Sequence, residues 1–331
     1  MIFPHHALIG AAAKIPIPKP RAILSFSPLV LDTPSRRVPL QVRVTAPVTQ
    51  PGDDVDAPLP ILLFSHGQGY SDWLSSHEGY APVAEFWASH GFAVVQPTHL
   101  SSQTLSLPLN AGSIRDLYLD SRVQDMRTLL DKLDEVEDGV PFLGRGRLDR
   151  SRIAVAGHSL GALTATMLLG ANNTDPRDGT KTLGGDPRIK AGAVIGGTGR
   201  SGDALSESGK KMVPFYGIDL STMTTPALVA WGDADVSPHL TVNGPTWHAD
   251  PYTLAPAPKT SLSIAGGTHG FGGISGWDTA ETRDGSVERL GTVQRMTWAY
   301  LWSALHEGDT AWEEACAALA ELPQLGRVES K

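Results

Sequence analysis

Cysteine is almost absent from this chain. The 331 residues include a single cysteine, Cys316, so no disulfide can form within the chain. The fold therefore does not depend on an oxidising compartment. Residues 1–20 have no basic start, and proline, histidine and lysine interrupt their apolar part, which makes a poor signal peptide. We expect a cytoplasmic protein.

Long hydrophobic runs and positive charge are also scarce. No stretch approaches the roughly 18 apolar residues of a membrane-spanning helix, so we expect no insertion into a membrane. The chain has 27 lysines and arginines against 35 aspartates and glutamates, a net charge of −8, and no long basic run. Nucleic acid and anionic membrane surfaces repel such a chain, and we expect neither as a partner.

The usual motifs for cofactors and metals are missing as well. No G-x-G-x-x-G opens a helix after a strand, and no Walker motif occurs. There is no H-E-x-x-H and no cysteine cluster, while His5 and His6 have no clear third ligand. We therefore expect no cofactor and no metal.

What the chain does have is a regular alternation of strand-like and helix-like segments, which predicts an α/β fold with a mostly parallel sheet. The eight predicted strands are 22–31, 38–45, 61–67, 92–97, 152–156, 191–197, 226–232 and 260–267. The main predicted helices are 79–89, 113–137, 286–305 and 309–320.

No repeat and no linker divides the chain, so we predict one domain over residues 1–331. Residues 171–188 and 198–225 are long, polar and poorly periodic, and we predict loop insertions there. Such loops either form a small lid over a site or cross the surface.

The most informative stretch is residues 152–161, RIAVAGHSLG, followed directly by the helix-forming run ALTATMLL. This order of strand, glycine-flanked serine and helix is the context of a G-x-S-x-G nucleophile elbow. It predicts Ser159 as a nucleophile, with Gly157 and Gly161 allowing a tight turn. A serine that only caps the helix is the plainer alternative.

A serine hydroxyl needs a histidine to accept its proton and a carboxylate to orient that histidine. In chain order these follow the elbow as acid and then base. The segment WGDADVSP after strand 226–232 offers Asp235, with Asp233 as the alternative. The segment SIAGGTHGF offers His269 as the base. The histidines expected to make structural hydrogen bonds instead are His66, His99, His158 and His248.

Acyl transfer also requires donors for a developing oxyanion. One is the backbone N–H of the residue after the nucleophile, Leu160. The glycine-rich segment FSHGQG at 64–69 predicts Gln68 as the second, although a plain strand-end turn has the same composition. The aromatic residues near these loops, taken as candidates for lining a substrate pocket, are Tyr70, Trp73 and Trp277.

These motifs, FSHG, AGHSLG, WGDADVSP and GGTHGF, together resemble the α/β-hydrolase superfamily over roughly residues 20–305. Within it, LLFSHG, ASHGFAVV and RLDRSRIAVAGHSLGALTA are most similar to the branch of chlorophyllases, platelet-activating-factor acetylhydrolases, dienelactone hydrolases and polyester hydrolases. The resemblance implies an eight-stranded sheet and hydrolysis of carboxylic esters without a cofactor. Carried over to this chain, it implies a triad of Ser159, Asp235 and His269 with oxyanion donors at Gln68 and Leu160.

The chain departs from that branch at several positions, and these departures weaken the case for any particular substrate of the branch. Many of its polyester hydrolases have an aromatic residue in place of Gln68 and methionine in place of Leu160. Dienelactone hydrolases use cysteine where this chain has Ser159. The resemblance therefore supports an esterase better than a particular ester.

We predict a serine carboxylic ester hydrolase that acts on small-molecule esters through an acyl-enzyme. An acyltransferase that uses the same triad is the first alternative, and a catalytically weak ligand-binding module is the second. One side of the predicted helix 309–320 is apolar, at Trp312, Ala315, Cys316 and Leu319. That side packs either internally or on a second subunit, so a homodimer stays open.

Overall fold

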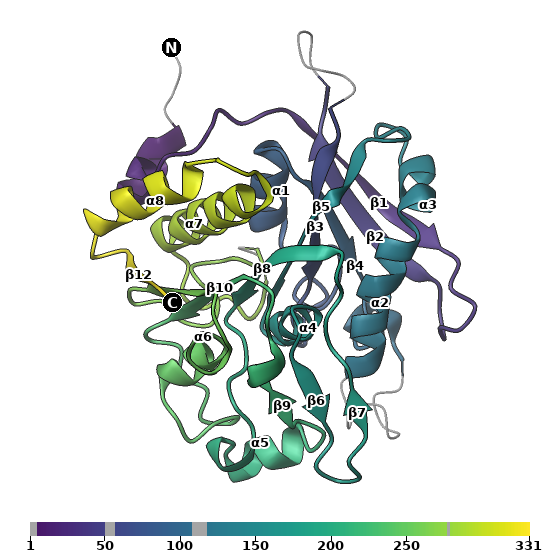
Figure 1. The fold of residues 1–331 in the computed structure, drawn as a ribbon, viewed down its shortest axis with the longest axis vertical. Helices are drawn as coiled ribbons and strands as arrows, with labels where there is room; N and C mark the ends of the chain where they lie inside the picture. The colour runs from purple at the N-terminus through teal and green to yellow at the C-terminus, as the bar shows by residue number, and fades with distance from the viewer. Residues whose placement is uncertain (1–4, 50–56, 108–117, 277–278) are drawn as a thin grey trace.

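The computed structural model describes residues 5–49, 57–107, 118–276 and 279–331, and a nine-stranded sheet runs through the molecule (Figure 1). In spatial order its strands are β1 (Ile23–Leu31), β2 (Leu40–Pro47), β4 (Ala93–Pro97), β3 (Leu59–Ser65), β5 (Leu148–His158), β8 (Ile189–Ile195), β10 (Ala227–Gly232), β11 (Lys259–Ile264) and β12 (Gly326–Ser330). The strands from β4 to β11 pair in parallel, whereas β2 and β12 run antiparallel to their neighbours. The predicted α/β class with a mostly parallel sheet is confirmed.

The predicted count of eight strands is one too low, because β12 follows the segment expected to be the last strand. It pairs with β11 from Thr260 opposite Ser330 to Ile264 opposite Gly326. Val328 is the one apolar residue in the segment GRVES, so hydrophobic periodicity gives no strand signal there. The open edge of β11, whose backbone groups need partners, makes this segment a strand.

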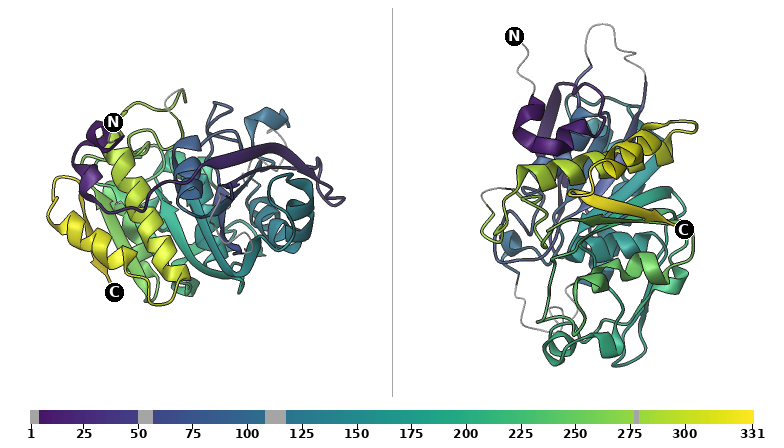
Figure 2. Two further views of the ribbon diagram at one scale, coloured as in Figure 1. Left: turned by 90° about the horizontal axis from the view of Figure 1, so that it is seen from above. Right: turned by 90° about the vertical axis from the view of Figure 1, so that its left-hand side faces the viewer.

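Helices cover both faces of the sheet, and each layer buries its own hydrophobic cluster (Figure 2). On one face lie the 3-10 helix η1 (His5–Lys14), α1 (Ala81–Ser89), α7 (Val287–Leu305) and α8 (Ala311–Ala320). On the other lie α2 (Leu119–Asp131), α3 (Leu133–Gly139) and α4 (Leu160–Leu168). The central strands β3 and β4 are buried along their whole length, which explains their continuous apolar sequences.

The predicted helix 113–137 is two helices in the described part of the chain, and residues 113–117 lie outside it. Lys132 leaves helical geometry, with φ −112° and ψ 24°, and separates α2 from α3. Leu130, Leu133 and Val136 are all buried on one side across the break. A one-residue interruption that preserves the apolar spacing leaves no trace in the periodicity.

The two segments predicted as loop insertions contain regular structure. They supply β6 (Asn172–Thr174), β7 (Lys181–Thr182) and β9 (Ile218–Asp219), which form a small three-stranded sheet, and α5 (Glu207–Met212). The same part of the chain holds the short 3-10 helices η4 (Gly202–Ala204) and η5 (Leu220–Thr222). This small sheet and α5 project together from the lower end of the molecule in Figure 1.

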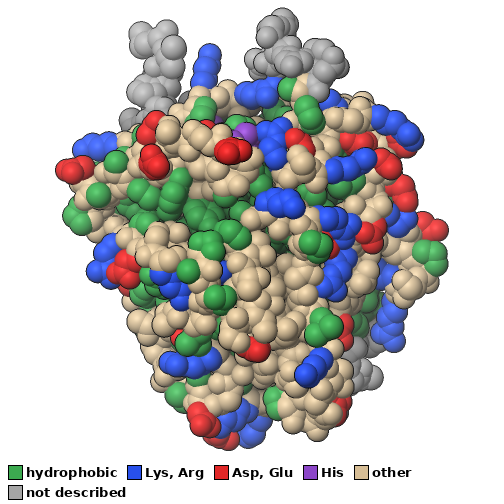
Figure 3. Space-filling view, viewed as in Figure 1, with side chains coloured by type: hydrophobic (Ala, Val, Ile, Leu, Met, Phe, Trp, Pro, Cys, Tyr) green, Lys and Arg blue, Asp and Glu red, His purple; other side chains and the backbone are tan. Residues whose placement is uncertain are grey.

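The apolar side of α8 packs internally. Ala315 is fully buried, Leu319 is nearly so, and the Trp312 ring meets the edge of Tyr300 on α7 with centroids 5.3 Å apart. Hydrophobic side chains gather on the surface over α7, while acidic and basic residues are interspersed over the rest of that face (Figure 3). Within the described residues, no helix combines the length and apolarity that crossing a membrane takes.

Parallel pairing brings the ends of several strands to one edge of the sheet. β3 ends at Ser65, β5 at His158, β10 at Gly232 and β11 at Ile264. The segments that follow these strands contain all the predicted catalytic residues and the oxyanion loop. Ligands of open α/β sheets bind beyond this edge.

Candidate active site

The turn between β5 and α4 holds Ser159 in a strained backbone conformation. Its φ of 57° and ψ of −122° lie where residues other than glycine are rare. A Cβ on Gly157 would lie 2.1 Å from the carbonyl oxygen of Gly161, and one on Gly161 would lie 1.9 Å from the carbonyl oxygen of Ser65. Both flanking positions therefore require glycine, and the turn presents the Ser159 side chain to a cavity.

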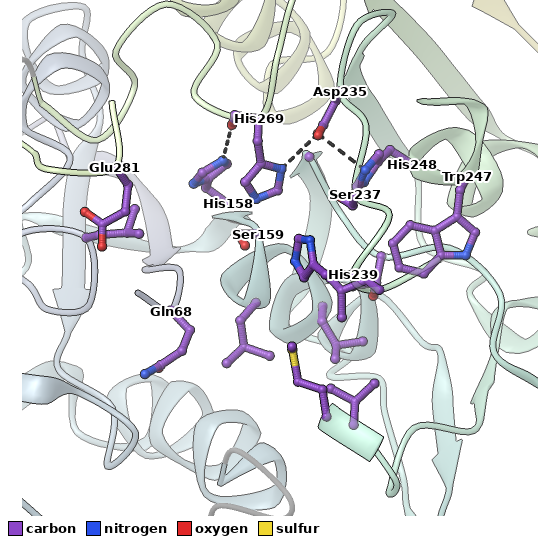
Figure 4. A pocket seen from close by; sticks show the side chains of 18 of the residues that line it. Gln68, His158, Ser159, Asp235, Ser237, His239, Trp247, His248, His269 and Glu281 are labelled. Carbon is purple, nitrogen blue, oxygen red and sulfur yellow. Dashed lines mark hydrogen bonds and ion pairs between the residues drawn. The ribbon is translucent and has the colours of Figure 1, made fainter. Parts of the chain in front are cut away.

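Asp235 and His269 meet above this turn (Figure 4). Nδ1 of His269 lies 2.8 Å from Oδ2 of Asp235. Burial by itself raises the pKa of Asp235, but the hydrogen bond from His269 acts against burial, and the pKa is lowered below its ordinary value. Asp235 is thus a carboxylate that can only accept, so His269 carries its proton on Nδ1 and leaves Nε2 free to accept one. Figure 4 shows the Ser159 hydroxyl beside the His269 ring.

The two aspartates of WGDADVSP have separate roles. Asp235 is 2% exposed and contacts His269. Asp233 is exposed, and its Oδ1 accepts the backbone N–H of Gly266 at 2.7 Å. Asp235 is therefore the aspartate that contacts His269, and Asp233 steadies the turn after β11.

The two predicted oxyanion donors face the same cavity as Ser159. Leu160 is the first residue of α4, so its N–H lies outside the hydrogen-bond ladder of that helix. Gln68 lines the cavity on the side of the loop after β3, and no hydrogen bond among the described residues uses its backbone N–H. Its side-chain Nε2 donates to the carbonyl of Ser101 at 3.0 Å, which fixes the loop.

A buried relay, which the sequence did not predict, joins the predicted oxyanion loop after β3, the elbow and the loop after β11 that carries His269. The N–H of Gly67 donates to the hydroxyl of Tyr80 at 3.0 Å. Burial raises the pKa of Tyr80, so its hydroxyl keeps its proton and donates to Nδ1 of His158, also at 3.0 Å. Nε2 of His158 in turn donates to the backbone carbonyl of His269 at 2.8 Å. Burial, then the charge of His269, lowers the pKa of His158 to about 3, so this ring stays neutral.

Beneath the oxyanion loop lies a buried arginine. Arg122 is 0% exposed and donates to the carbonyl of His66, to Oγ of Ser101 at 2.7 Å and to Oγ1 of Thr164 at 3.0 Å. Burial lowers the pKa of Arg122 to about 9. Arg122 therefore ties the loop after β3 to α4.

Two of the histidines expected to be structural complete this support. Nδ1 of His66 donates to the Gly67 carbonyl at 2.7 Å, and its Nε2 accepts the N–H of His99 at 3.0 Å. Nδ1 of His99 lies 2.9 Å from Oδ2 of Asp125.

The cavity over Ser159 has a volume of about 430 Å³. One wall is apolar and includes Leu163, Leu205, Phe215 and Leu240. No lysine or arginine in the described part of the chain lines it. Of the two insertions, 198–225 supplies much of the apolar wall, whereas 171–188 contributes no lining residue.

Two of the three predicted pocket aromatics do not lie where the sequence suggested. Tyr70 and Trp73 do not line the cavity, and they are 66% and 44% exposed. Glu281 holds their loop by accepting the N–H groups of Tyr70 and Ser71 at 2.8 and 2.9 Å, and both aromatic side chains are left facing solvent. Trp277 lies outside the described residues. The aromatic residues of the cavity are instead Phe215, Tyr216 and Trp247.

A second histidine faces the candidate acid. His248, in the 3-10 helix η6 (Pro245–Ala249) that precedes α6 (Asp250–Leu254), donates from Nδ1 to the carbonyl of Gly197 at 2.7 Å. Its Nε2 lies 3.4 Å from Oδ2 of Asp235. The sequence predicted a hydrogen-bonding role for His248, and its bond to Gly197 is of that kind, but its contact with Asp235 was not foreseen. Ligand atoms of Asp235, His248 and His269 lie within 4.8 Å of one another.

No protein-family model and no curated protein matches the sequence. Solved structures do match. A ferulic acid esterase from Streptomyces cinnamoneus aligns with a TM-score of 0.55 and 18% identity, over 90% of this chain and 97% of that one. An acylaminoacyl peptidase from Pyrococcus horikoshii aligns with a TM-score of 0.50 and 14% identity, over 90% of this chain and 44% of that one. A Pyrobaculum calidifontis esterase has a TM-score of 0.49 and 18% identity, over 87% of this chain and 88% of that one.

At such low identity the likeness establishes the fold alone. Together with the observed sheet and its two helical layers, it shows that this chain has the α/β-hydrolase fold. The narrower resemblance to the chlorophyllase and polyester hydrolase branch stays a prediction.

Replacing Gly161 with alanine tests the tightness of the elbow. The new Cβ would lie 1.9 Å from the Ser65 carbonyl oxygen, so we expect Gly161→Ala to lower the free energy of unfolding by about 1–3 kcal/mol or more. Urea unfolding measures this change. Gly244→Ala is the control, because a Cβ there meets nothing within 4 Å and should change stability by less than about 0.5 kcal/mol. Equal effects of the two substitutions would contradict the steric argument.

Replacing Tyr80 with phenylalanine tests the buried relay. Tyr80→Phe leaves Nδ1 of His158 and the N–H of Gly67 without the hydroxyl that both contact, and we expect a loss of about 1–3 kcal/mol in unfolding free energy. Thermal and urea unfolding provide the measurement. Tyr70→Phe, at an exposed ring, is the matched control and should leave stability unchanged. If Tyr80→Phe left the free energy of unfolding unchanged, water would replace the hydroxyl without cost and the relay would not contribute to stability.

Proposed function

We propose that this protein is a serine ester hydrolase whose triad is Ser159, His269 and Asp235. The observation that carries the proposal is the meeting of three groups at one cavity: a serine on a strained elbow, a histidine with a free Nε2, and a buried carboxylate on that histidine's Nδ1. This arrangement activates a hydroxyl for attack on a carbonyl carbon. The esterase and peptidase names among the structural neighbours agree with this chemistry.

The proposed reaction follows from the positions of these atoms. Oγ of Ser159 attacks the ester carbonyl as its proton passes to Nε2 of His269. The carbonyl oxygen becomes an anion that the backbone N–H groups of Gln68 and Leu160 stabilise. The C–O bond then breaks, and His269 gives its proton to the leaving alkoxide. A water molecule attacks the acyl-enzyme by the same route, so His269 is restored and Ser159 released.

The lining of the cavity supports uncharged esters with an apolar acyl group. The leucine-rich wall disfavours polar chains, and the described lining offers the carboxylates of Asp235 and Glu281 but no lysine or arginine to bind an anionic substrate. Phe215, Tyr216 and Trp247 can contact an aromatic acyl group, and one structural neighbour is named a ferulic acid esterase. A panel of neutral aliphatic and aromatic esters therefore suits a first assay. Product analysis with added alcohol separates hydrolysis from acyl transfer.

A fluorophosphonate probe tests the nucleophile directly. The wild-type protein should gain one adduct by intact mass, and Ser159→Ala should gain none, because the probe reacts with an activated serine. Ser237→Ala is the control, since Ser237 lines the same cavity and should not affect labelling. An adduct that persists in Ser159→Ala would overturn the assignment.

Substituting the two neighbouring aspartates tests the acid. Asp235→Asn removes the charge that fixes the tautomer of His269, and we expect kcat to fall by roughly 10⁴-fold. Asp233→Asn alters an exposed turn and should retain kcat within a few-fold. Steady-state kinetics on a hydrolysed ester measure both variants. The reverse ranking would place the triad acid at Asp233.

A further inference from the structure

Next to the candidate triad, His248 presents a buried nitrogen with no hydrogen-bond partner. The residue is 2% exposed, and its Nε2 makes no hydrogen bond among the described residues. The carbonyl of Gly197 can only accept, so the ring proton resides on Nδ1 and Nε2 is bare in the neutral ring. The bare nitrogen points at a carboxylate oxygen 3.4 Å away (Figure 4).

Two lone pairs that face each other in a buried place call for a cation between them. The surroundings favour one. The carboxylate of Asp235 faces His248, and Asp250, a second buried carboxylate, follows His248 two residues later at the start of α6. The guanidinium of Arg200 is paired with Asp250 at 3.5 Å. No lysine or arginine in the described part of the chain lines the cavity.

We propose that Asp235, His248 and His269 form a Zn²⁺ site whose occupation switches the enzyme off. The ligands would be Oδ2 of Asp235, Nε2 of His248 and Nδ1 of His269, a donor set of two imidazoles and one carboxylate that zinc prefers. The cavity side leaves a fourth position for water.

The spacing of these atoms suits a shared ion after a small movement. Oδ2 of Asp235 is 2.8 Å from Nδ1 of His269 and 3.4 Å from Nε2 of His248, and all three atoms lie within 4.8 Å. With Zn–N and Zn–O distances of about 2.0–2.2 Å, the two nitrogens must draw closer. His269 can supply that movement, because its side chain is 43% exposed while the other two are almost fully buried.

His248 is already held as zinc ligands usually are. A metal-binding histidine generally donates its other ring N–H to a carbonyl or carboxylate, which orients the ring and fixes its tautomer. The bond from Nδ1 of His248 to Gly197 provides this support in the absence of an ion. A histidine that only filled space would not need a bare nitrogen aimed at Asp235.

Zinc at this place would remove the base by changing its tautomer. Nδ1 of His269 would bind the metal instead of its proton, and the ring's one proton would move to Nε2. A ring protonated on Nε2 cannot accept the proton of Ser159, so attack on the ester stops. This inhibitory consequence rests on the proposed function, whereas zinc binding itself does not.

Calorimetry on the Ser159→Ala protein tests binding without any need for turnover. We expect one Zn²⁺ per chain, and no binding of Mg²⁺, which prefers an all-oxygen octahedral shell. Adding His248→Asn should weaken zinc binding roughly tenfold or more, because the amide can still donate to Gly197 but no ligand reaches the ion. His239→Asn is the control: His239 also lines the cavity, is exposed, and lies outside the cluster.

Inhibition of ester hydrolysis by the wild-type protein provides the second measurement. Zinc should inhibit near its calorimetric Kd, and a chelator should restore the rate. In His248→Asn, compared with its own metal-free rate, half-inhibition should need roughly tenfold more zinc or higher. If melting shows that His248→Asn is unfolded, His248→Phe replaces it, because phenylalanine keeps a ring of similar size and offers no ligand.

Three results would overturn the proposal. The first is the absence of zinc binding to Ser159→Ala. The second is zinc binding that stays equally tight without His248. The third is a loss of binding in His239→Asn instead, which would place the ion at the cavity mouth. None of these results affects the fluorophosphonate test, so failure of the zinc site and failure of the proposed function can be told apart.

Discussion

The close approach of two backbone segments at the elbow is the constraint on which the rest of the site depends. α4 begins so near the end of β3 that a single Cβ on Gly161 would strike the Ser65 carbonyl. This contact sets the strained turn at Ser159 beside the loop that carries Gln68, so the predicted nucleophile and the predicted oxyanion donors are positioned by the same rigid contact. Backbone strain of this kind persists only where the surrounding packing over-determines it. β3, which is buried along its whole length, and the buried second half of β5 provide that packing.

A chain of hydrogen bonds then connects this rigid region to His269, the proposed base, and the direction of each bond is determined. The carbonyl of His269 can only accept, so the bond from His158 fixes which nitrogen of the His158 ring holds the proton. That choice makes the other nitrogen an acceptor for Tyr80, and the Tyr80 oxygen in turn accepts from Gly67. A charged His158 could not complete this chain, and its low pKa keeps it neutral. The three loops of the site are therefore fixed relative to one another by a chain of hydrogen bonds. Every bond in the chain donates in the same direction, from Gly67 toward His269.

The sequence predicted what local chemistry specifies. The elbow at Ser159 and the strand-end position of Asp235 follow from motifs a few residues long, and the alternation of elements specified a mostly parallel sheet. The sequence could not predict β12, because the open edge of β11, and not the composition of the segment itself, decides that this segment pairs as a strand. Nor could it predict the role of Tyr80, because its partners lie 13 and 78 residues away along the chain. Tyr70 illustrates the opposite error: nearness in sequence to the oxyanion loop suggested the pocket, but the backbone bonds to Glu281 leave the side chain outside it.

One oxygen of Asp235 faces two histidine rings, and only one of them brings a proton to it. His269 donates to Oδ2, while the proton of His248 is engaged by Gly197. In this buried cluster, Oδ2 of Asp235 and Nε2 of His248 both present lone pairs, but only His269 donates a hydrogen. The result is an excess of negative potential in a place with little water to screen it. Under the proposed mechanism this excess favours the transition state, because His269 becomes a cation there and the bare nitrogen of His248 adds to the field of Asp235. The same negative potential would attract a divalent metal ion. Under the two proposals, the arrangement that makes His269 a better base is therefore also the one that binds zinc.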